Sequence, residues 1–333
     1  MNPRRTFQHV RDFQSRSLDR SDTPPSGAHP SLAPVCNDPI QQAALRESRG
    51  ELAQEQLTRT NIRAWVADPR VSLYANRQLR PAEVVLLLRY ANWLEGRVLE
   101  LGSGAGRLSG YLAARGGTVV GLDVSPKMVT YSRRAYPDIE FRVGDLSELQ
   151  NFESRSRELV VATGNVLDVL EDEIRRRSLR EITRILTDDG VLLFSSHNEA
   201  FVPNVRGPLE IVLQSPDALR LVWNLLHLPR RVKNRRAWAK EQRVERDHAL
   251  VNDHAHDFRF LHYYISRDNQ ERQLLEAGFE LLDCLDGDGV EVPPGRGADA
   301  SPTLHYAAQV RRPLPDVLNE RAAATTTSQG ESR

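Results

Sequence analysis

The sequence of 333 residues has only two cysteines, and none of its apolar stretches is long. Cys36 and Cys284 lie far apart and in no redox or metal-binding spacing, which excludes a disulfide framework and a zinc motif. We therefore expect a reducing, cytoplasmic compartment. A membrane-spanning helix needs about 18 or more apolar residues in succession, so we expect no transmembrane segment.

Lysine is also scarce. Only three of the 45 basic residues are lysines, and 45 acidic residues balance them, so the formal net charge is zero. A neutral chain has no overall field that attracts nucleic acid, so we do not expect a nucleic-acid partner. We interpret the preference for arginine as the mark of a GC-rich bacterial genome.

The most informative pattern is a glycine turn between an apolar run and a helix. Residues 97–107 read RVLELGSGAGR, and the segment 108–114 that follows is typical of the start of a helix. Such a turn places bare backbone N–H groups against a ligand, and glycine permits both the close approach and the unusual φ/ψ angles. A dinucleotide fingerprint requires a third glycine where Arg107 stands, so the spacing disfavours a nicotinamide cofactor.

Four more landmarks follow in order over about a hundred residues. They are an apolar strand pattern ending at Asp123, a GDL segment at 144–146, an apolar run at 157–163, and a helix, turn and strand over 181–194. With the E-x-G-x-G-x-G motif of residues 100–106, this order resembles the class I S-adenosylmethionine (SAM) dependent methyltransferases of the small-molecule type. The resemblance implies an α/β, Rossmann-like, doubly wound sheet of seven strands, mostly parallel with an antiparallel last strand, plus a helical lid insertion.

The resemblance also implies a SAM site at the glycine turn. In it Glu100 would bind the methionine amine, Asp123 would hold the ribose hydroxyls and Met128 would pack on adenine. Arg107 would either bind the methionine carboxylate or cap the helix surface, and Tyr74 would either cover the cofactor or belong to the core. The expected cofactor-binding residues are Tyr74, Glu100, Gly102, Ser103, Gly104, Gly106, Arg107, Asp123, Val124, Met128, Gly144, Asp145, Leu146 and Thr163.

Candidates for the reacting centre follow from the strand ends. The fourth expected strand ends near residues 163–168 and the fifth near 195–198, and open α/β sheets bind ligands at these carboxyl ends. We therefore select Asn165, Asp168 and His197 and, from a later histidine-rich segment, His256. A histidine there could accept a proton from the acceptor as the methyl group moves. Asn165 does not stand in the N-P-P-Y signature of nucleic-acid amino methyltransferases, which weakens an adenine acceptor.

The chain divides into a core and flanking segments. Composition predicts disordered tails at 1–35 and 313–333, and the resemblance implies a methyltransferase domain at 36–312. Within the domain we expect a helical N-terminal cap at 36–94, a SAM-binding core at 95–198, a lid insertion at 199–265, and a helix with a strand pair at 266–312.

The lid insertion leaves several interpretations open. Its apolar segment 219–228 predicts a helix that packs on the domain or on a homodimer partner, or that forms a substrate wall. Its segment 229–246 carries a local charge of +6. This second segment is either a solvated face or a contact for an anionic substrate, a peripheral membrane surface or, least favoured, RNA. Its last segment, 248–266, contains four histidines, but the spacing matches no closed zinc pattern, so we expect no metal.

These observations predict an enzyme, a SAM-dependent methyltransferase acting by in-line SN2 transfer on a small-molecule acceptor. An anionic, partly apolar acceptor of bacterial secondary metabolism suits the basic segment, and O-, N- and C-methylation all stay open. The alternatives are a membrane-surface methyltransferase of a lipid-like acceptor and a non-catalytic SAM-binding partner protein.

Overall fold

A computed structural model describes residues 39–66, 78–295 and 301–311. The chain divides into two compact units, residues 1–46 and residues 47–333, and the larger one contains every feature described below. Helix α1 (Pro39–Val66) begins in the first unit and continues into the second. The expected disordered tails and Tyr74 lie outside the described residues.

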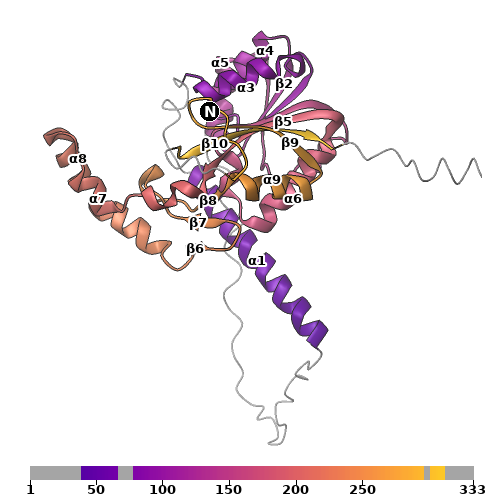
Figure 1. The fold of residues 1–333 in the computed structure, drawn as a ribbon. Coiled ribbons are helices and arrows are strands. Elements are labelled where there is room, and N and C mark those ends of the chain that lie inside the picture. The colour runs from indigo at the N-terminus through magenta and orange to yellow at the C-terminus, as the bar shows by residue number, and fades with distance from the viewer. Residues whose placement is uncertain (1–38, 67–77, 296–300, 312–333) are drawn as a thin grey trace, which may run out of the picture. The chain divides into compact units, whose positions relative to one another are not determined.

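The larger unit is organised around one mixed sheet (Figure 1). Strands β3, β2, β1, β4 and β5 lie in that order and run parallel, and β10 pairs antiparallel with both β5 and β9. The strands are β1 (Arg97–Leu101), β2 (Thr118–Asp123), β3 (Glu140–Val143), β4 (Arg157–Ala162), β5 (Leu186–Asn198), β9 (Phe279–Leu285) and β10 (Thr303–Val310). This order confirms the predicted Rossmann-like sheet with an antiparallel last strand.

Helices cover both faces of this sheet, because apolar side chains point alternately to either side of each strand. Val98 of β1 packs with one set of helices and Leu99, its neighbour, packs with the other. Figure 1 shows the first set, α3, α4 and α5, along one face, and α6 and α9 along the opposite face. These helices are α3 (Pro81–Arg89), α4 (Arg107–Ala114), α5 (Pro126–Ala135), α6 (Asp172–Ile185) and α9 (Arg267–Glu276).

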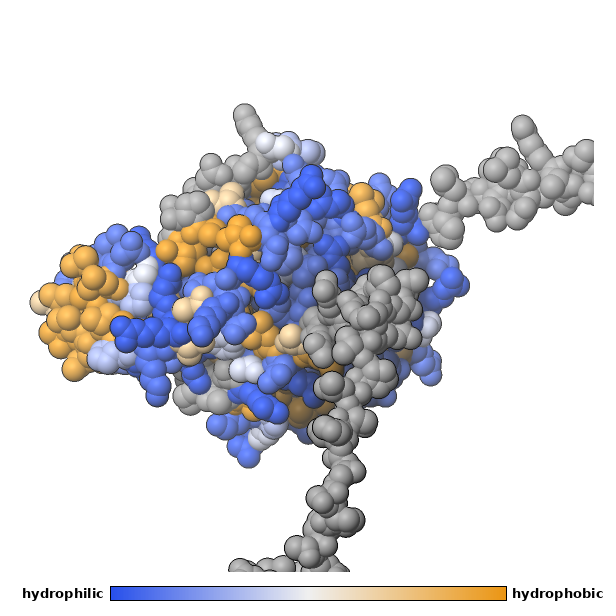
Figure 2. Space-filling model, turned by 90° about the horizontal axis from the view of Figure 1, so that it is seen from below, coloured by the Kyte–Doolittle hydropathy of each residue, from blue (hydrophilic) through white to orange (hydrophobic). Residues whose placement is uncertain are grey.

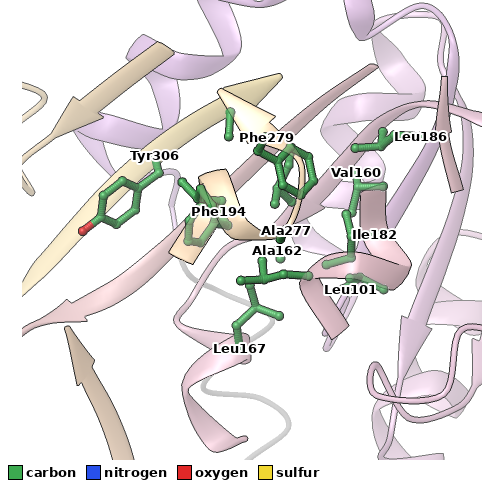
Figure 3. Close-up of a cluster of buried hydrophobic side chains, with 14 of the residues drawn as sticks. Leu101, Val160, Ala162, Leu167, Ile182, Leu186, Phe194, Ala277, Phe279 and Tyr306 are labelled. Carbon is green, nitrogen blue, oxygen red and sulfur yellow. The ribbon is translucent and has the colours of Figure 1, made fainter. Parts of the chain in front are cut away.

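The core beneath α6 and α9 is shown in Figure 3. Phe194 of β5 stacks on Tyr306 of β10 with ring centroids 4.9 Å apart, and Ile182 of α6 is fully buried. Each such apolar side chain contributes about 1.5–3 kcal/mol when it leaves water. This packing fixes β4 and β5 beside each other, and with them the strand ends that carry polar residues.

The insertion, residues 199–265, is helical only in its first part. After the 3₁₀ turn η3 (Glu199–Asn204) come α7 (Pro208–Leu213) and α8 (Ala218–Ala237), and then three short strands: β6 (Arg243–Val244), β7 (Ala249–Val251) and β8 (His262–Ile265). The predicted helical lid insertion therefore contains short strands as well as helices. The sequence gives only a weak signal for β7 and β8. Both strands are short and buried along their whole length, so they show no alternation of apolar and polar residues.

The expected apolar helix and the first part of the basic segment 229–246 form one continuous helix, α8, with Pro229 in its interior. Proline has no N–H for the Leu225 carbonyl four residues earlier. Both residues are exposed, so water can bond this carbonyl in place of the missing N–H.

Strand β8 brings the insertion back to the sheet. His197 and Asn198 at the end of β5 pair in parallel with Tyr264 and Ile265 of β8, while His197 also pairs with Thr303 of β10. Because β10 occupies one edge of β5, β8 takes the other edge, which β4 leaves free beyond Ala162. The β6–β8 meander thus stands past the carboxyl end of β4.

Candidate functional site

The glycine turn between β1 and α4 has the backbone that the motif predicts. Gly102, Gly104 and Gly106 all adopt positive φ angles, of 68°, 54° and 82°. A Cβ on Gly102 would come within 2.3 Å of Val166, and one on Gly106 within 2.9 Å of Tyr136. At these two positions a side chain is excluded both by conformation and by space.

A pocket opens beside this turn, at the carboxyl ends of β1, β2 and β4. Gly106 does not line it, because this glycine packs α4 against α5 and β3 instead. All the other expected cofactor residues that the structure describes do line it: Glu100, Gly102, Ser103, Gly104, Arg107, Asp123, Val124, Met128, Gly144, Asp145, Leu146 and Thr163.

Asp123 fixes the turn that surrounds this pocket. Its carboxylate accepts hydrogen bonds from the backbone N–H groups of Gly104 and Ser125, each at 2.8 Å. Burial raises the pKa of Asp123, although these two N–H groups act in the opposite direction. A carboxylate oxygen has two lone pairs, so both oxygens can still accept a hydroxyl of a ligand.

Glu100 is the second buried acid of the pocket. Burial raises the pKa of Glu100 to about 8, although the hydrogen bond from the Ser109 hydroxyl and the charge of Arg107 both act to lower it. The hydroxyl of Ser103, also in the pocket wall, is buried without a partner among the described residues. A buried carboxyl that a nearby cation would ionise and an unpartnered hydroxyl in one pocket fit a ligand that brings a cation and hydrogen-bonding groups.

Arg107 lines the pocket at the start of α4, and its role towards a cofactor stays a prediction. Its guanidinium contacts both carboxylate oxygens of Glu83 on α3, each at 3.1 Å. Burial works to raise the pKa of Glu83, but Arg107 outweighs it and the pKa lies below its usual value. The pair joins α3 to the start of α4 at the rim of the pocket.

Asn165 lies in the same pocket, after the end of β4. Its side-chain oxygen accepts from the Ser195 hydroxyl at 2.7 Å, and its amide donates to the Thr303 hydroxyl at 3.2 Å. These bonds join the ends of β4, β5 and β10, and the left-handed φ of 60° at Asn165 is one that asparagine tolerates. Asn165 thus has a fixed orientation at the carboxyl edge of the sheet.

Asp168 and His197 form a hydrogen-bonded pair just beyond Asn165. One Asp168 oxygen lies 2.7 Å from both the backbone N and Nδ1 of His197, and the other lies 2.7 Å from the Arg175 guanidinium. Burial works to raise the pKa of Asp168, but Arg175 and His197 lower it further than burial raises it. Because its ionised carboxylate accepts Nδ1–H, Nε2 of His197 is left as the basic nitrogen.

A second acid and histidine lie against the first pair. Nδ1 of His262 is 2.9 Å from Asp253, the Tyr264 hydroxyl donates to the same oxygen at 2.7 Å, and the rings of His197 and His262 are 4.9 Å apart. Burial works to lower the pKa of His262, but Asp253 outweighs it and raises the pKa.

His197, Asp253 and His262 also offer metal-ligating atoms within 4.8 Å of one another. A metal ion there would have to replace hydrogen bonds that already satisfy Asp253. The expectation that the chain uses no metal stays a prediction.

His256, the remaining catalytic candidate, lies apart from these two pairs. Its ring contacts the ring of Trp65, with centroids 4.4 Å apart, and Trp65 of α1 lines the pocket. His256 is therefore one aromatic ring away from the pocket wall. The structure thus brings Asn165, Asp168 and His197 together at one edge and leaves His256 at a different wall.

Several residues of this region were not found from the sequence. Arg175 is fully buried and pairs with Asp168, although it stands in a run of three arginines that is typical of a solvated face. Asp253 and His262 were noted only as members of a histidine-rich segment, since nothing local shows that β8 returns beside β5. The one available signal for Arg175 is its place three and four residues before Ser178 and Leu179, on the apolar side of α6.

The comparisons with known proteins fall on this same part of the chain. Residues 98–190 match the family model of a methyltransferase domain. A provisionally named methyltransferase of Geobacillus sp. (strain WCH70) is 26% identical over 59% of this chain and 79% of its own length. The 2-heptyl-1-hydroxyquinolin-4(1H)-one methyltransferase of Mycobacteroides abscessus is 28% identical over 39% of this chain and 59% of its own. A demethylmenaquinone methyltransferase of Chlorobaculum tepidum is 33% identical over 29% of this chain and 38% of its own.

Among solved structures, the CcbJ methyltransferase of Streptomyces caelestis superposes with a TM-score of 0.49 at 17% identity, covering 74% of this chain and 98% of its own.

With the glycine turn, its acids and the sheet order in place, residues 98–190 form a methyltransferase domain of the class I SAM-dependent type. The cofactor of this class is SAM. The polar wall described above fits that group, since the buried Glu100 suits its ammonium and the free capacity of Asp123 suits its ribose. Among the described residues, no helix is both long enough and apolar enough to cross a membrane.

Proposed function

We propose that this methyltransferase acts on a small-molecule acceptor that binds between the carboxyl ends of β4 and β5 and the β6–β8 meander. The observation that carries the proposal is the juxtaposition of the glycine-turn pocket with the Asp168–His197 pair, through Asn165. The names of the relatives from Mycobacteroides and Chlorobaculum give hydroxyquinolone and quinone acceptors, which supports a partly apolar ring as the acceptor, and the first name supports a hydroxyl on it.

In this proposal Asp123 binds the ribose hydroxyls, Glu100 pairs with the methionine amine, and Met128 packs on adenine. The bound cofactor supplies an electrophilic methyl group on a sulfonium. The chain's main task is then to align the acceptor and to exclude water, and such orientation contributes roughly 7–11 kcal/mol. The rigid strand ends of β4 and β5 suit this task.

His197 is the proposed general base for an acceptor that loses a proton. Asp168 holds Nδ1–H of His197 and stabilises the imidazolium that forms when Nε2 accepts the proton. The neighbouring His262 is paired with Asp253, whose charge raises the pKa of the His262 ring.

A lipid-like acceptor at a membrane surface is the second candidate. The observation that favours it is the exposed apolar surface of α7 and α8, together with the quinone named for the Chlorobaculum relative. The same surface also suits a homodimer contact. In a non-catalytic SAM-binding partner protein, by contrast, the Asp168–His197 pair would have no chemical role.

The proposal is tested in two stages on the full chain. Titration calorimetry with S-adenosylhomocysteine, with NADH as the control ligand, first measures cofactor binding. A screen then follows S-adenosylhomocysteine formation with 2-heptyl-1-hydroxyquinolin-4(1H)-one, a demethylmenaquinone analogue and related phenols as acceptors. Binding without turnover on any acceptor class would support the non-catalytic alternative, and binding of NADH alone would overturn the proposal.

A further inference from the structure

Helices α7 and α8 pack on each other as a hairpin. Among the described residues, the side-chain hydrogen bonds and ion pairs that join α8 to the rest of the insertion come from its second half and from Trp238, which follows the helix: Arg231 pairs with Asp257 at 2.9 Å, and the Trp238 indole donates to the Arg259 carbonyl at 3.0 Å. The first half of α8 packs instead on α7, through Asn224 and the Ile211 carbonyl.

Helix α7 and the first half of α8 carry exposed apolar side chains. Leu219, Leu226 and Leu213 are 86%, 72% and 75% exposed, and Val222 and Trp223 are exposed beside them. Figure 2 shows the resulting apolar surface at the left of the molecule. Single exposed leucines are ordinary, but a contiguous apolar patch marks a surface that binds a partner or a membrane.

The same face of α8 becomes basic in its second half. Leu219, Val222 and Leu226 recur at helical spacing, and Lys233 follows seven residues after Leu226, two turns further along. Arg236 extends the basic part, and Lys240 follows after the helix has ended at Ala237. In the described chain, neither Lys233 nor Arg236 takes part in an ion pair. The opposite face carries the buried Asn224 and Arg231.

We propose that this hairpin docks the protein on an anionic lipid bilayer. The apolar half of α8, with α7, enters the headgroup boundary, where the Trp223 indole finds both an apolar and a polar environment. The basic half then lies over the lipid phosphates.

A bilayer matches this surface better than a second copy of the chain does. One face of α8 carries an apolar segment followed by cations without an ion pair. A bilayer is complementary to this face, because it has an anionic surface above an apolar interior. A second copy would bring another set of the same cations, and the chain has no net charge with which to offset them. The docking also does not depend on the proposed acceptor, since no residue of the pocket takes part.

The test is flotation of the full-length protein with two kinds of vesicle. One is phosphatidylcholine alone, and in the other about a third of the lipid is phosphatidylglycerol. We expect the protein to bind the anionic vesicles and to bind the neutral vesicles at least tenfold more weakly. Binding to the anionic vesicles should weaken as the ionic strength rises. The double variant Leu219→Ser/Leu226→Ser should lose at least tenfold in vesicle affinity, and Lys233→Gln/Arg236→Gln should lose the salt dependence.

Two matched controls keep the test specific. Leu88→Ser removes a leucine of α3 that is 65% exposed, and Arg134→Gln removes an exposed cation of α5, so both should bind vesicles as the original chain does. S-adenosylhomocysteine affinity reports folding, and sedimentation reports the oligomeric state. The proposal is wrong if the original chain does not bind anionic vesicles. It is also wrong if Leu219→Ser/Leu226→Ser converts a dimer to a monomer without a loss of vesicle affinity.

Discussion

The sheet core and the insertion meet at the end of β5, and each region is stabilised by a different kind of interaction. In the core, apolar side chains alternate along β1, β4 and β5 and pack under helices on both faces. In the insertion, the apolar clusters are small, and fully buried polar side chains hold the backbone. The Asn252 amide, for example, donates to the carbonyls of Phe258 and Phe260.

This difference indicates which region is replaceable. Many apolar residues of suitable size satisfy an alternating pattern, so the core depends on no single side chain. A buried amide that closes a loop has no substitute, because its loss leaves carbonyls without a donor. The core therefore suits a task common to the class, cofactor binding, and the insertion suits a task particular to this chain.

The sharpest test of the comparison is His197, which lies at the junction of the two regions. His197→Ala should lower kcat by about 10²–10⁴-fold, because it removes the proposed general base, and it should leave S-adenosylhomocysteine affinity nearly unchanged. Steady-state kinetics on the acceptor found by screening give kcat and KM separately. His254→Ala, at an exposed histidine of the insertion, is the control. If His256→Ala lowers kcat and His197→Ala does not, the base belongs to the other wall.

The core should respond most strongly at Asp123. Asp123→Ala should weaken S-adenosylhomocysteine binding about 100-fold, since two hydrogen bonds to an ionised group are worth about 1.5 kcal/mol each at the low end. Titration calorimetry measures this effect, and Asp138→Ala, at an exposed aspartate, is the control. An unchanged affinity would show that the cofactor assignment is wrong.

The insertion should respond most strongly at Asn252. Asn252→Ala should destabilise the protein by about 2 kcal/mol, roughly a 30-fold change in the unfolding equilibrium, because two buried carbonyls lose their donor. Urea unfolding measures it, with the exposed Asn151→Ala as the control. Cofactor affinity should stay within threefold, and a large loss would mean that the two regions are not separable.

The smallest effect expected is a pH dependence from Glu100. Its pKa of about 8 means that the carboxyl is protonated at neutral pH, and a bound ammonium favours the ionised form. Binding should therefore release a proton, and the affinity should rise up to about tenfold per pH unit as the pH approaches 8. Calorimetry in two buffers of different ionisation enthalpy measures the proton. Glu100→Gln should abolish the dependence, and a flat profile for the original chain would contradict the assignment.

The core could be predicted from sequence because its signals are local. Strand β1, the glycines after it and the acid that ends β2 lie within about thirty residues, and β9 and β10 begin and end where their apolar runs do. The Asp168–His197–Arg175 cluster could not be predicted as a whole, because its members come from η2 (Val166–Val169), β5 and α6. Only the packing of α6 on β5 brings Arg175 to the carboxylate.

Asp253, His262 and Tyr264 were harder still to place. Their chain segment returns beside His197 only because β8 pairs with the last two residues of β5. No periodicity over four residues distinguishes such a strand from a buried turn of helix.

The pairing of Asn198 with Ile265 determines how easily the insertion could be exchanged for another segment. The insertion leaves the sheet at one of these residues and returns at the other, so its two ends are neighbours. Segments with adjacent ends can be lengthened, shortened or exchanged with little entropic cost to the host domain. Recombination at these two positions would give a related chain a new acceptor wall and membrane-facing hairpin while the cofactor domain stayed intact.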